Sequence, residues 1–502
     1  MRKTTEETNG VKSSLRLPAT LAVGFTGHRL LHDEANCRKW IYDFLKRKKV
    51  SARGVVHGVS SLAAGGDLLF AECCFELELP LCVLLPLPVE GFRKDFDDRG
   101  WARVEQALSK AASVEVAGGD QPRNECYYEC GIETVLQSQM LLALWNGAPA
   151  EGLGGTEDIV TFAKELGRTV VWLHSVSGEV SAFNEKSDEE LADDAELEFL
   201  NNLPDLNVTA DTDAPHVLAR AWFRKVDESA TRSAPQFRRL AAIPIIFTAA
   251  AALFSGAGSW ARSVGAWLAA GTAMGILAAI LPAALRLQKK QILWARTRTA
   301  AEVCRSVLAF WSAPAPYDAI GPEVVPELSG MLVSLNLLKS IDRESGKASL
   351  AEFKERYRRE RVAGQIDYMF SHAAQSEAEG RRYRIATWAC IGLAIALNAW
   401  LFVGARFFGI VFGEWKQWMA LGASVAFQIA TVAGALLAVN DCDRRRERYR
   451  GLHRQLEKWD AQLVALRTWP SVLRVAGRIE RALLTELIEW RSLIRNHKHA
   501  RK

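Results

Sequence analysis

Three glycine-containing turns in the first 160 residues have the composition of an anion-binding site. Each combines small residues and hydroxyl groups with the expected start of a helix, where unpaired backbone N–H groups and the helix dipole attract negative charge. Glycine lets a phosphate approach the backbone closely, and no turn has the GxxxxGK[ST] pattern of a P-loop. The residues concerned are Thr26, Gly27, Ser60, Ser61, Gly65, Gly66, Gly154, Gly155 and Thr156. The pattern predicts binding of a phosphate-bearing ligand.

Short apolar segments precede these turns and alternate with helical patterns. The expected strands cover residues 22–26, 55–59, 81–85, 113–117, 140–145 and 169–174. Such alternation predicts a parallel, doubly wound sheet with its ligand site at the carboxyl ends of the strands. A single glycine-rich turn is most simply explained by turn geometry, but three at one end of one sheet strengthen the site hypothesis.

Nearby side chains leave several roles open. His28 is interpreted either as a base or nucleobase contact, or as a strand-end histidine bonded to backbone. Asp67 and Glu72 could form an acid–base pair, but their spacing favours a helix cap and a solvated charge. Cys126 and Cys130 have no matching pair of ligands, so buried thiols are expected and no metal. The nine cysteines form no disulfide framework, and residues 1–20 lack the apolar core of a signal peptide. These features favour a cytosolic domain.

The second half of the chain contains four uncharged apolar runs, at residues 240–257, 264–285, 385–404 and 418–439. Each is long enough to cross a hydrocarbon core of roughly 30 Å, so two membrane hairpins are predicted. Basic residues flank the hairpins at Arg232, Arg238, Arg239, Arg286, Lys289, Lys290, Arg381, Arg382, Arg384 and Arg444 to Arg446. This bias predicts that both termini and the central segment are cytosolic. Lipid headgroups and topology explain these runs, so no nucleic acid is expected.

Two polar residues, Asn398 and Gln428, lie within the second predicted hairpin. They are expected either to serve a subunit interface that matters for membrane function or to pack within one protomer. With no charge in any predicted span, gross membrane disruption is a better expectation than selective ion conduction.

The order of the turns resembles the SLOG domain, a Rossmann-like relative of the LOG and DprA nucleotide-binding proteins, over residues 18–175. The matching segments are Val23 to Arg29, Ser60 to Asp67 with Glu72, Pro86 to Pro88, Phe92 to Phe96, and Gly152 to Glu157. The resemblance implies a nucleotide-derived ligand and no cofactor. It implies ligand contacts from Gly24, Thr26, Gly27, His28, Arg29, Ser60, Ser61, Gly65, Asp67, Lys94, Gly154, Gly155, Thr156 and Glu157.

One position departs from the LOG enzymes, whose PGGxGTxxE motif ends in a catalytic glutamate. Ile159 occupies that position, and Glu157 and Asp158 would lie at other angles on the helix. The departure favours ligand sensing over catalysis, so no catalytic residue is assigned.

Residues 216–502 resemble the SLATT family of membrane effector domains, chiefly through the segment Glu355 to Tyr368. An acidic linker, residues 176–215, is expected between the two regions. The two resemblances together imply an antiphage effector of the bacterial inner membrane, acting as a homo-oligomer. Its partners would be the lipid bilayer and a nucleotide second messenger from a synthase or a TIR-domain enzyme. The alternatives are a membrane-anchored LOG-like nucleotide hydrolase and a passive scaffold.

Overall fold

The computed structural model of the protein describes residues 15–117, 121–149, 152–191, 194–204, 214–258, 264–284, 287–314, 317, 319–321, 324–342, 348–408 and 415–499. The described residues form two compact units. The first contains the residues up to 225 together with 304–348, and the second contains 226–303 and the residues from 349 onward.

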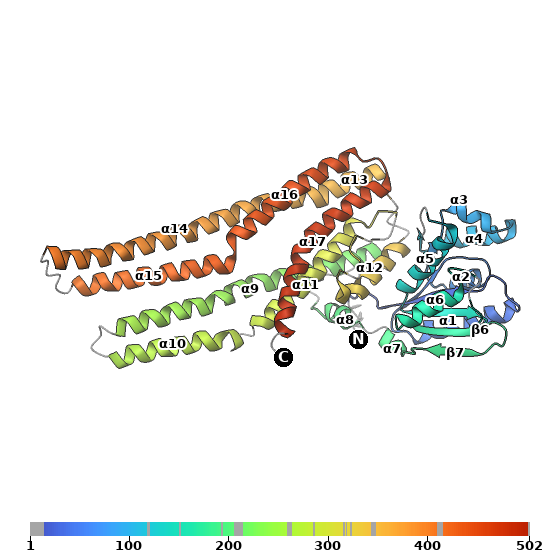
Figure 1. The fold of residues 1–502 in the computed structure, drawn as a ribbon, viewed down its shortest axis with the longest axis horizontal. Coiled ribbons are helices and arrows are strands. Elements are labelled where there is room, and N and C mark those ends of the chain that lie inside the picture. Colours follow the sequence, from blue (N-terminus) through green and yellow to red (C-terminus); the bar gives the residue numbers. More distant parts are fainter. Residues whose placement is uncertain are drawn as a thin grey trace, which may run out of the picture. The chain divides into compact units, whose positions relative to one another are not determined.

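A seven-stranded sheet lies at the centre of the first unit (Figure 1). Its strands are β1 (Thr20–Gly27), β2 (Val55–Ser60), β3 (Leu81–Leu85), β4 (Ser113–Val116), β5 (Met140–Trp145), β6 (Thr169–His174) and β7 (Val180–Phe183), in the order β4-β3-β2-β1-β5-β6-β7. The first six pair in parallel and only β7 is antiparallel. The predicted parallel α/β sheet is therefore confirmed. Strands β2 to β4 lie on one side of β1, and strands β5 to β7 lie on the other. The order of the strands therefore reverses between β1 and β5, and this position is the topological switch point of the sheet.

Helices cover both faces of this sheet. On one face, α1 (Glu34–Ser51), α2 (Gly66–Glu76) and α4 (Asp98–Lys110) bury apolar residues against Leu21, Val23 and Phe25 of β1. On the other face, α5 (Arg123–Leu136) and α6 (Thr156–Glu165) pack on Leu141, Ala143 and Val170. The short helix α3 (Val89–Phe92) and the 3₁₀ turn η1 (Arg93–Asp95) follow β3. Both faces are buried, as the apolar strand sequences require.

The segment predicted as a linker contains ordered elements. Strand β7 extends the sheet, and α7 (Asp188–Leu191) and α8 (Ala195–Asn201) follow it. Asn201 exchanges two hydrogen bonds of 2.9 Å with the backbone of Leu17 and accepts a third from Trp222 Nε1. The buried Lys225 donates to the carbonyl oxygens of Leu15 and Asn201 at 3.1 and 2.8 Å. These bonds fix the start of α9 (Pro215–Gly258) within the first unit.

Residues 304–348, which the sequence assigned to the membrane region, also belong to the first unit. They include the end of α11 (Leu287–Ala309), the 3₁₀ turn η2 (Pro326–Leu328) and α12 (Ser329–Ile341). Asn336 exchanges two hydrogen bonds of 3.1 Å with the backbone of Tyr317, whose hydroxyl lies 2.5 Å from that of Ser306. Helices α9 and α11 therefore each have one end in each unit.

The second unit is helical. Besides parts of α9 and α11 it contains α10 (Val264–Ala284), α13 (Leu350–Tyr357), the π-helix η3 (Arg358–Ala363), α14 (Gly364–Phe407), α15 (Trp415–Asn440), α16 (Cys442–Ala465) and α17 (Trp469–His499). Ser349 and Glu352 form a capping box at the start of α13. The helical run continues from α13 through η3 into α14.

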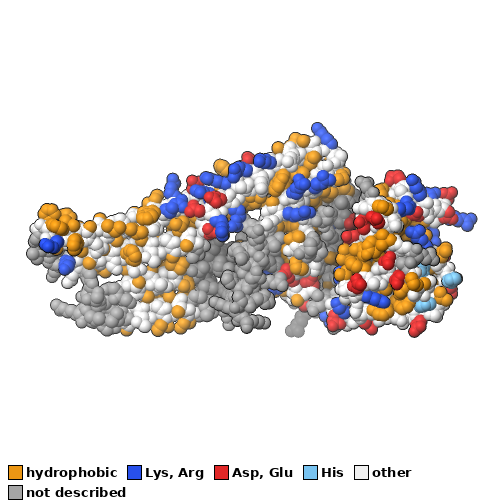
Figure 2. Space-filling view, viewed as in Figure 1, with side chains coloured by type: hydrophobic (Ala, Val, Ile, Leu, Met, Phe, Trp, Pro, Cys, Tyr) orange, Lys and Arg blue, Asp and Glu red, His pale blue; other side chains and the backbone are white. Residues whose placement is uncertain are grey.

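Two helical runs are long and apolar enough to cross a membrane, Leu350–Phe407 and Trp415–Ala465. Helices α14 and α15 within them pack through small residues, with Ala394, Ala423 and Ala426 buried between them. In Figure 2 the surface over α14 and α15 carries many hydrophobic side chains and few charged ones, and charged side chains gather where α14 runs beside α16. Among the described side chains of the other hairpin, apolar segments cover Ile243–Phe254 and Ala269–Leu281. Membrane-capable helices are therefore present, and the four-span arrangement stays a prediction.

The orientation of the hairpins can be tested by thiol labelling. Both predicted loops should lie outside the cytoplasm because the arginine clusters flank the opposite ends of the apolar runs. Ser259 and Gly413, which lie outside the described residues, would each be replaced by cysteine in a chain lacking its native cysteines. An impermeant thiol reagent should label both in intact spheroplasts, and a cysteine at the exposed Ser187 should stay unlabelled. Protection of both loop cysteines would contradict this topology.

Candidate functional site

The turns that follow β1 and β2 are held against each other by backbone contacts. The N–H of Gly66 donates to the carbonyl of His28 at 3.1 Å, and the N–H of His28 donates to Leu144 of β5 at 3.1 Å. Gly65 has a φ of +85°, and a Cβ there would lie 2.4 Å from the carbonyl oxygen of Arg29. Only glycine fits this position, both sterically and conformationally. The two turns thus form one backbone surface at the switch point.

The third turn packs on α5. Gly154 has a φ of +86°, and a Cβ there would lie 2.8 Å from the backbone nitrogen of Tyr128. Its N–H donates to the carboxylate of Asp158 at 2.9 Å, and the N–H of Gly155 donates to Gly152 at 3.2 Å. Gly155 is the N-cap of α6 and, having no side chain, makes no capping hydrogen bond. Helix α6 therefore begins at Thr156, and its N-terminal dipole gives the third turn a positive partial charge.

Asp67 is a buried carboxyl group at the start of α2, with 3% of its surface exposed. It accepts hydrogen bonds from Ser61 Oγ at 2.7 Å and Ser60 Oγ at 3.3 Å. Burial raises the pKa of Asp67 to about 7, although both hydroxyls and the charge of Arg29 act in the opposite direction. Ser60, Ser61 and Asp67 therefore form one hydrogen-bonded unit whose charge changes near neutral pH.

His28 and Arg29 point to different neighbours. The Nε2 atom of His28 accepts a hydrogen bond of 2.9 Å from the backbone N–H of Asn146, after β5. Of the two interpretations of His28, the structure therefore shows the backbone-bonded one. Arg29 is exposed, and its guanidinium lies 4.9 Å from the ring centre of Tyr127 on α5. This cation–π contact directs a positive charge over the region between the first and third turns.

Tyr127 and its neighbours were not predicted from the sequence. Its hydroxyl donates to the carboxylate of Asp95, which also accepts from Arg123. Burial raises the pKa of the Tyr127 phenol well above its usual range, and Asp95 adds to the effect. The Phe92 to Phe96 motif contained Asp95, so its carboxylate was a usable signal. Nothing in the helical pattern of α5 distinguished Tyr127 from a core aromatic residue.

The remaining predicted ligand residues are not all at this surface. Gly24 lies within β1, where a Cβ would come 2.6 Å from Ser138 Oγ, so its small size serves packing of α5. Thr26 and Gly27 are half-buried at the end of β1, beside the turn. Lys94 is exposed on η1. Ile159 is 2% exposed, and its side chain points from α6 into the core. It packs closely on Gly131 of α5, where an added Cβ would lie 2.4 Å from its Cδ1 atom.

Asn398 and Gln428 lie in the second unit. The Nδ2 atom of Asn398 donates to the carbonyl of Ala394, in its own helix, at 2.8 Å. Gln428 is half-buried on α15. The described bond of Asn398 thus stabilises one helix.

No group of three or more metal-ligating side chains occurs within the part of the chain that the structure describes. Comparison of the sequence with protein-family models and with curated proteins finds no match. The candidate site accordingly stands on the geometry of the three turns, the charge of Arg29 and the titratable Asp67.

The charge of Asp67 should make stability depend on pH. The pKa of Asp67 is about 7 in the folded state, against an ordinary value of 3.8. The protonated carboxyl therefore contributes fully to the free energy of unfolding below pH 3.8, and this contribution is lost as the pH rises through 7. At pH 8, Asp67→Asn should therefore have a higher free energy of unfolding than the native chain, by on the order of 4 kcal/mol, and a higher melting temperature. At pH 4.5 the two proteins should differ little.

The measurement is a tryptophan-fluorescence thermal scan of the full-length protein in detergent. Asp98→Asn, whose side chain is 98% exposed, is the control and should show no such trend. A constant difference between Asp67→Asn and the native chain from pH 4.5 to 8 would show that Asp67 does not titrate as described.

Proposed function

We propose that the first unit binds a nucleotide second messenger at the three turns and that the apolar helices then disrupt the bacterial inner membrane. The observation that carries this proposal is the meeting of the first two turns at the β1–β5 switch point, with the Arg29 guanidinium directed over Tyr127. A helix N-terminus and an exposed cation together suit a phosphate. Tyr127 offers an aromatic surface beside them.

Sensing explains the site better than turnover. The position that would hold a catalytic glutamate is occupied by Ile159, whose side chain lies in the core. A carboxylate at this place would have to be buried among apolar residues. The competing function is a nucleotide hydrolase, and one observation favours it: Asp67 has a pKa of about 7, suited to proton transfer. Its burial and its two serine partners argue for a structural or ligand-linked role instead.

The membrane part of the proposal rests on the apolar helices and the chain connections. Helices α9 and α11 pass from one unit into the other, so a change at the sensor has a covalent route to the first hairpin. A ligand can shift such an equilibrium only through its different affinities for the two states. The proposed effector is a homo-oligomer, as the sequence resemblance implies, and its sensor and termini are cytosolic, as the flanking basic residues indicate.

Two substitutions test the anion contacts. Arg29→Ala removes the exposed cation and Thr156→Ala removes the hydroxyl at the start of α6. Each should weaken nucleotide binding about tenfold to a hundredfold, because a charge-assisted bond contributes roughly 1.5–3 kcal/mol. Arg47→Ala and Thr161→Ala are matched controls, since both residues are exposed on helices and Thr161 shares α6 with Thr156.

Binding and products would be followed together on full-length protein with a panel of cyclic oligonucleotides, ADP-ribose derivatives and mononucleotides. We expect binding without product formation, lost in the two site variants and kept in the two controls. Multiple turnover with release of free base would instead support the hydrolase. Equal affinity in Arg29→Ala and Arg47→Ala would remove Arg29 from the site.

A further inference from the structure

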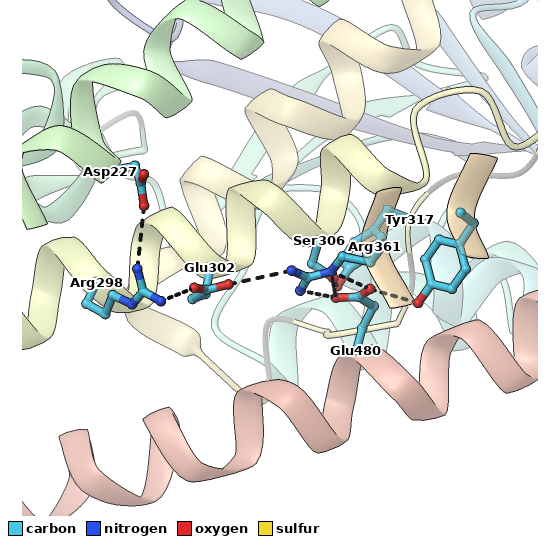
Figure 3. Close-up of polar contacts among 8 residues, drawn as sticks. Asp227, Arg298, Glu302, Ser306, Tyr317, Arg361 and Glu480 are labelled. Atoms are coloured by element: carbon cyan, nitrogen blue, oxygen red, sulfur yellow. Dashed lines mark hydrogen bonds and ion pairs between the residues drawn. The ribbon is translucent and has the colours of Figure 1, made fainter. Parts of the chain in front are cut away.

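A network of paired charges lies in the second unit, and its most buried pair is found where the π-helix η3 meets α17. Arg361 of η3 is 5% exposed and Glu480 of α17 is fully buried. Arg361 Nη2 lies 2.7 Å from Glu480 Oε2, and its Nε lies 3.0 Å from Oε1. Tyr357 donates its hydroxyl to Glu480 Oε1 at 2.8 Å. Figure 3 shows this pair between the two helices.

The network continues to two further helices. Arg361 Nη1 is 3.8 Å from Glu302 of α11, and Glu302 pairs with Arg298 of the same helix at 2.5 Å. Arg298 then reaches Asp227 of α9 at 3.5 Å (Figure 3). Burial alone would lower the pKa of Arg361, but the charge of Glu480 outweighs it and the pKa is raised. The chain of contacts therefore holds its charges by mutual pairing.

These helices are the ones that lead to the apolar hairpins. Helix α9 continues from Asp227 into the apolar segment Ile243–Phe254, and α11 follows α10. The π-helix runs directly into α14, and α17 follows the helices α15 and α16. One set of contacts thus joins the helical extensions of both hairpins.

Buried ion pairs are a poor source of net stability, and in some proteins they select one arrangement of the packed elements. Apolar residues of similar volume often stabilise a fold as well or better, whereas removal of one partner leaves a costly buried charge. A π-helix is likewise less favourable than an α-helix and frequently marks functional positions. The combination favours one arrangement of the four helices strongly and penalises partly opened ones.

We propose that this network is a latch that holds the extensions of the two hairpins in one closed arrangement. Opening it separates α17 from η3 by breaking the Arg361–Glu480 pair and frees the two hairpins to move relative to each other. The latch is independent of the ligand site, and only its effect on a membrane rests on the proposed function.

The latch is tested by hydrogen exchange of the full-length protein in lipid nanodiscs. Glu480→Gln keeps the size of the side chain but removes its charge, and Tyr357→Phe removes one hydrogen bond to it. Exchange in residues 357–363 and 469–485 should become at least tenfold faster in Glu480→Gln and show a smaller rise in Tyr357→Phe. Strands β1 and β5 should be unaffected.

Asp460→Asn is the matched control. Asp460 of α16 makes a bidentate pair with Arg358, which lies in η3 like Arg361, at 2.7 and 2.9 Å. Unlike Arg361 and Glu480, both of these side chains are about one-quarter to one-third exposed. It should leave exchange in residues 469–485 unchanged. Equal exchange in Glu480→Gln and the native chain would overturn the latch. If hydrogen exchange in Glu480→Gln is faster throughout the protein, the result from Tyr357→Phe is used instead. Faster exchange confined to residues 357–363 and 469–485 in Tyr357→Phe supports the latch, and unchanged exchange there overturns it.

Leakage of dye from liposomes containing the same variants separates the latch from the proposed function. Ligand-independent leakage with Glu480→Gln, but not with Asp460→Asn, supports both. Faster local exchange without any leakage supports the latch and contradicts membrane disruption.

Discussion

The reversal of strand order beside β1 is the constraint on which the candidate site depends. Because β2 and β5 pair with opposite edges of β1, the loops after these strands converge at its carboxyl end. The backbone bond from Gly66 to His28, and the lack of room for any side chain at Gly65, then join two of the loops into one surface. The third loop is fixed separately by Gly154 against α5. Local glycine chemistry and sheet topology together thus produce a surface that neither would create alone.

The charged side chains singled out in the two units differ in exposure and pairing. In the first, Arg29 is exposed, and burial raises the pKa of the Asp67 carboxyl to about 7. In the second, Arg361 and Glu480 are buried and mutually paired, so they resist change until the whole set separates. A responsive site and a resistant latch are the two properties that a switch needs. Helices α9 and α11, which have residues in both units, provide continuous chain between them.

Sequence periodicity was sufficient for the six parallel strands and the apolar helices, because buried strands and long apolar runs have strong local signals. It missed β7, whose side chains alternate between exposed and half-buried positions in a segment that is otherwise acidic. The sequence pattern also placed residues 304–348 in the membrane region. Helix α11 has the pattern of one continuous helix, but its end packs in the first unit. Asp95, Tyr127 and the Arg361–Glu480 pair depend on contacts between residues far apart in the chain, which no spacing rule contains.

The proposal that the three turns hold the phosphate groups of a nucleotide can be tested by determining the structure of the ligand-bound protein. The full-length protein would be purified from phage-infected bacteria and its structure determined by electron cryo-microscopy. We expect density for a nucleotide whose phosphate groups lie against the turns formed by residues 27–29, 65–66 and 154–156. A bound nucleotide at any other place in the chain, with these turns empty, would contradict the account.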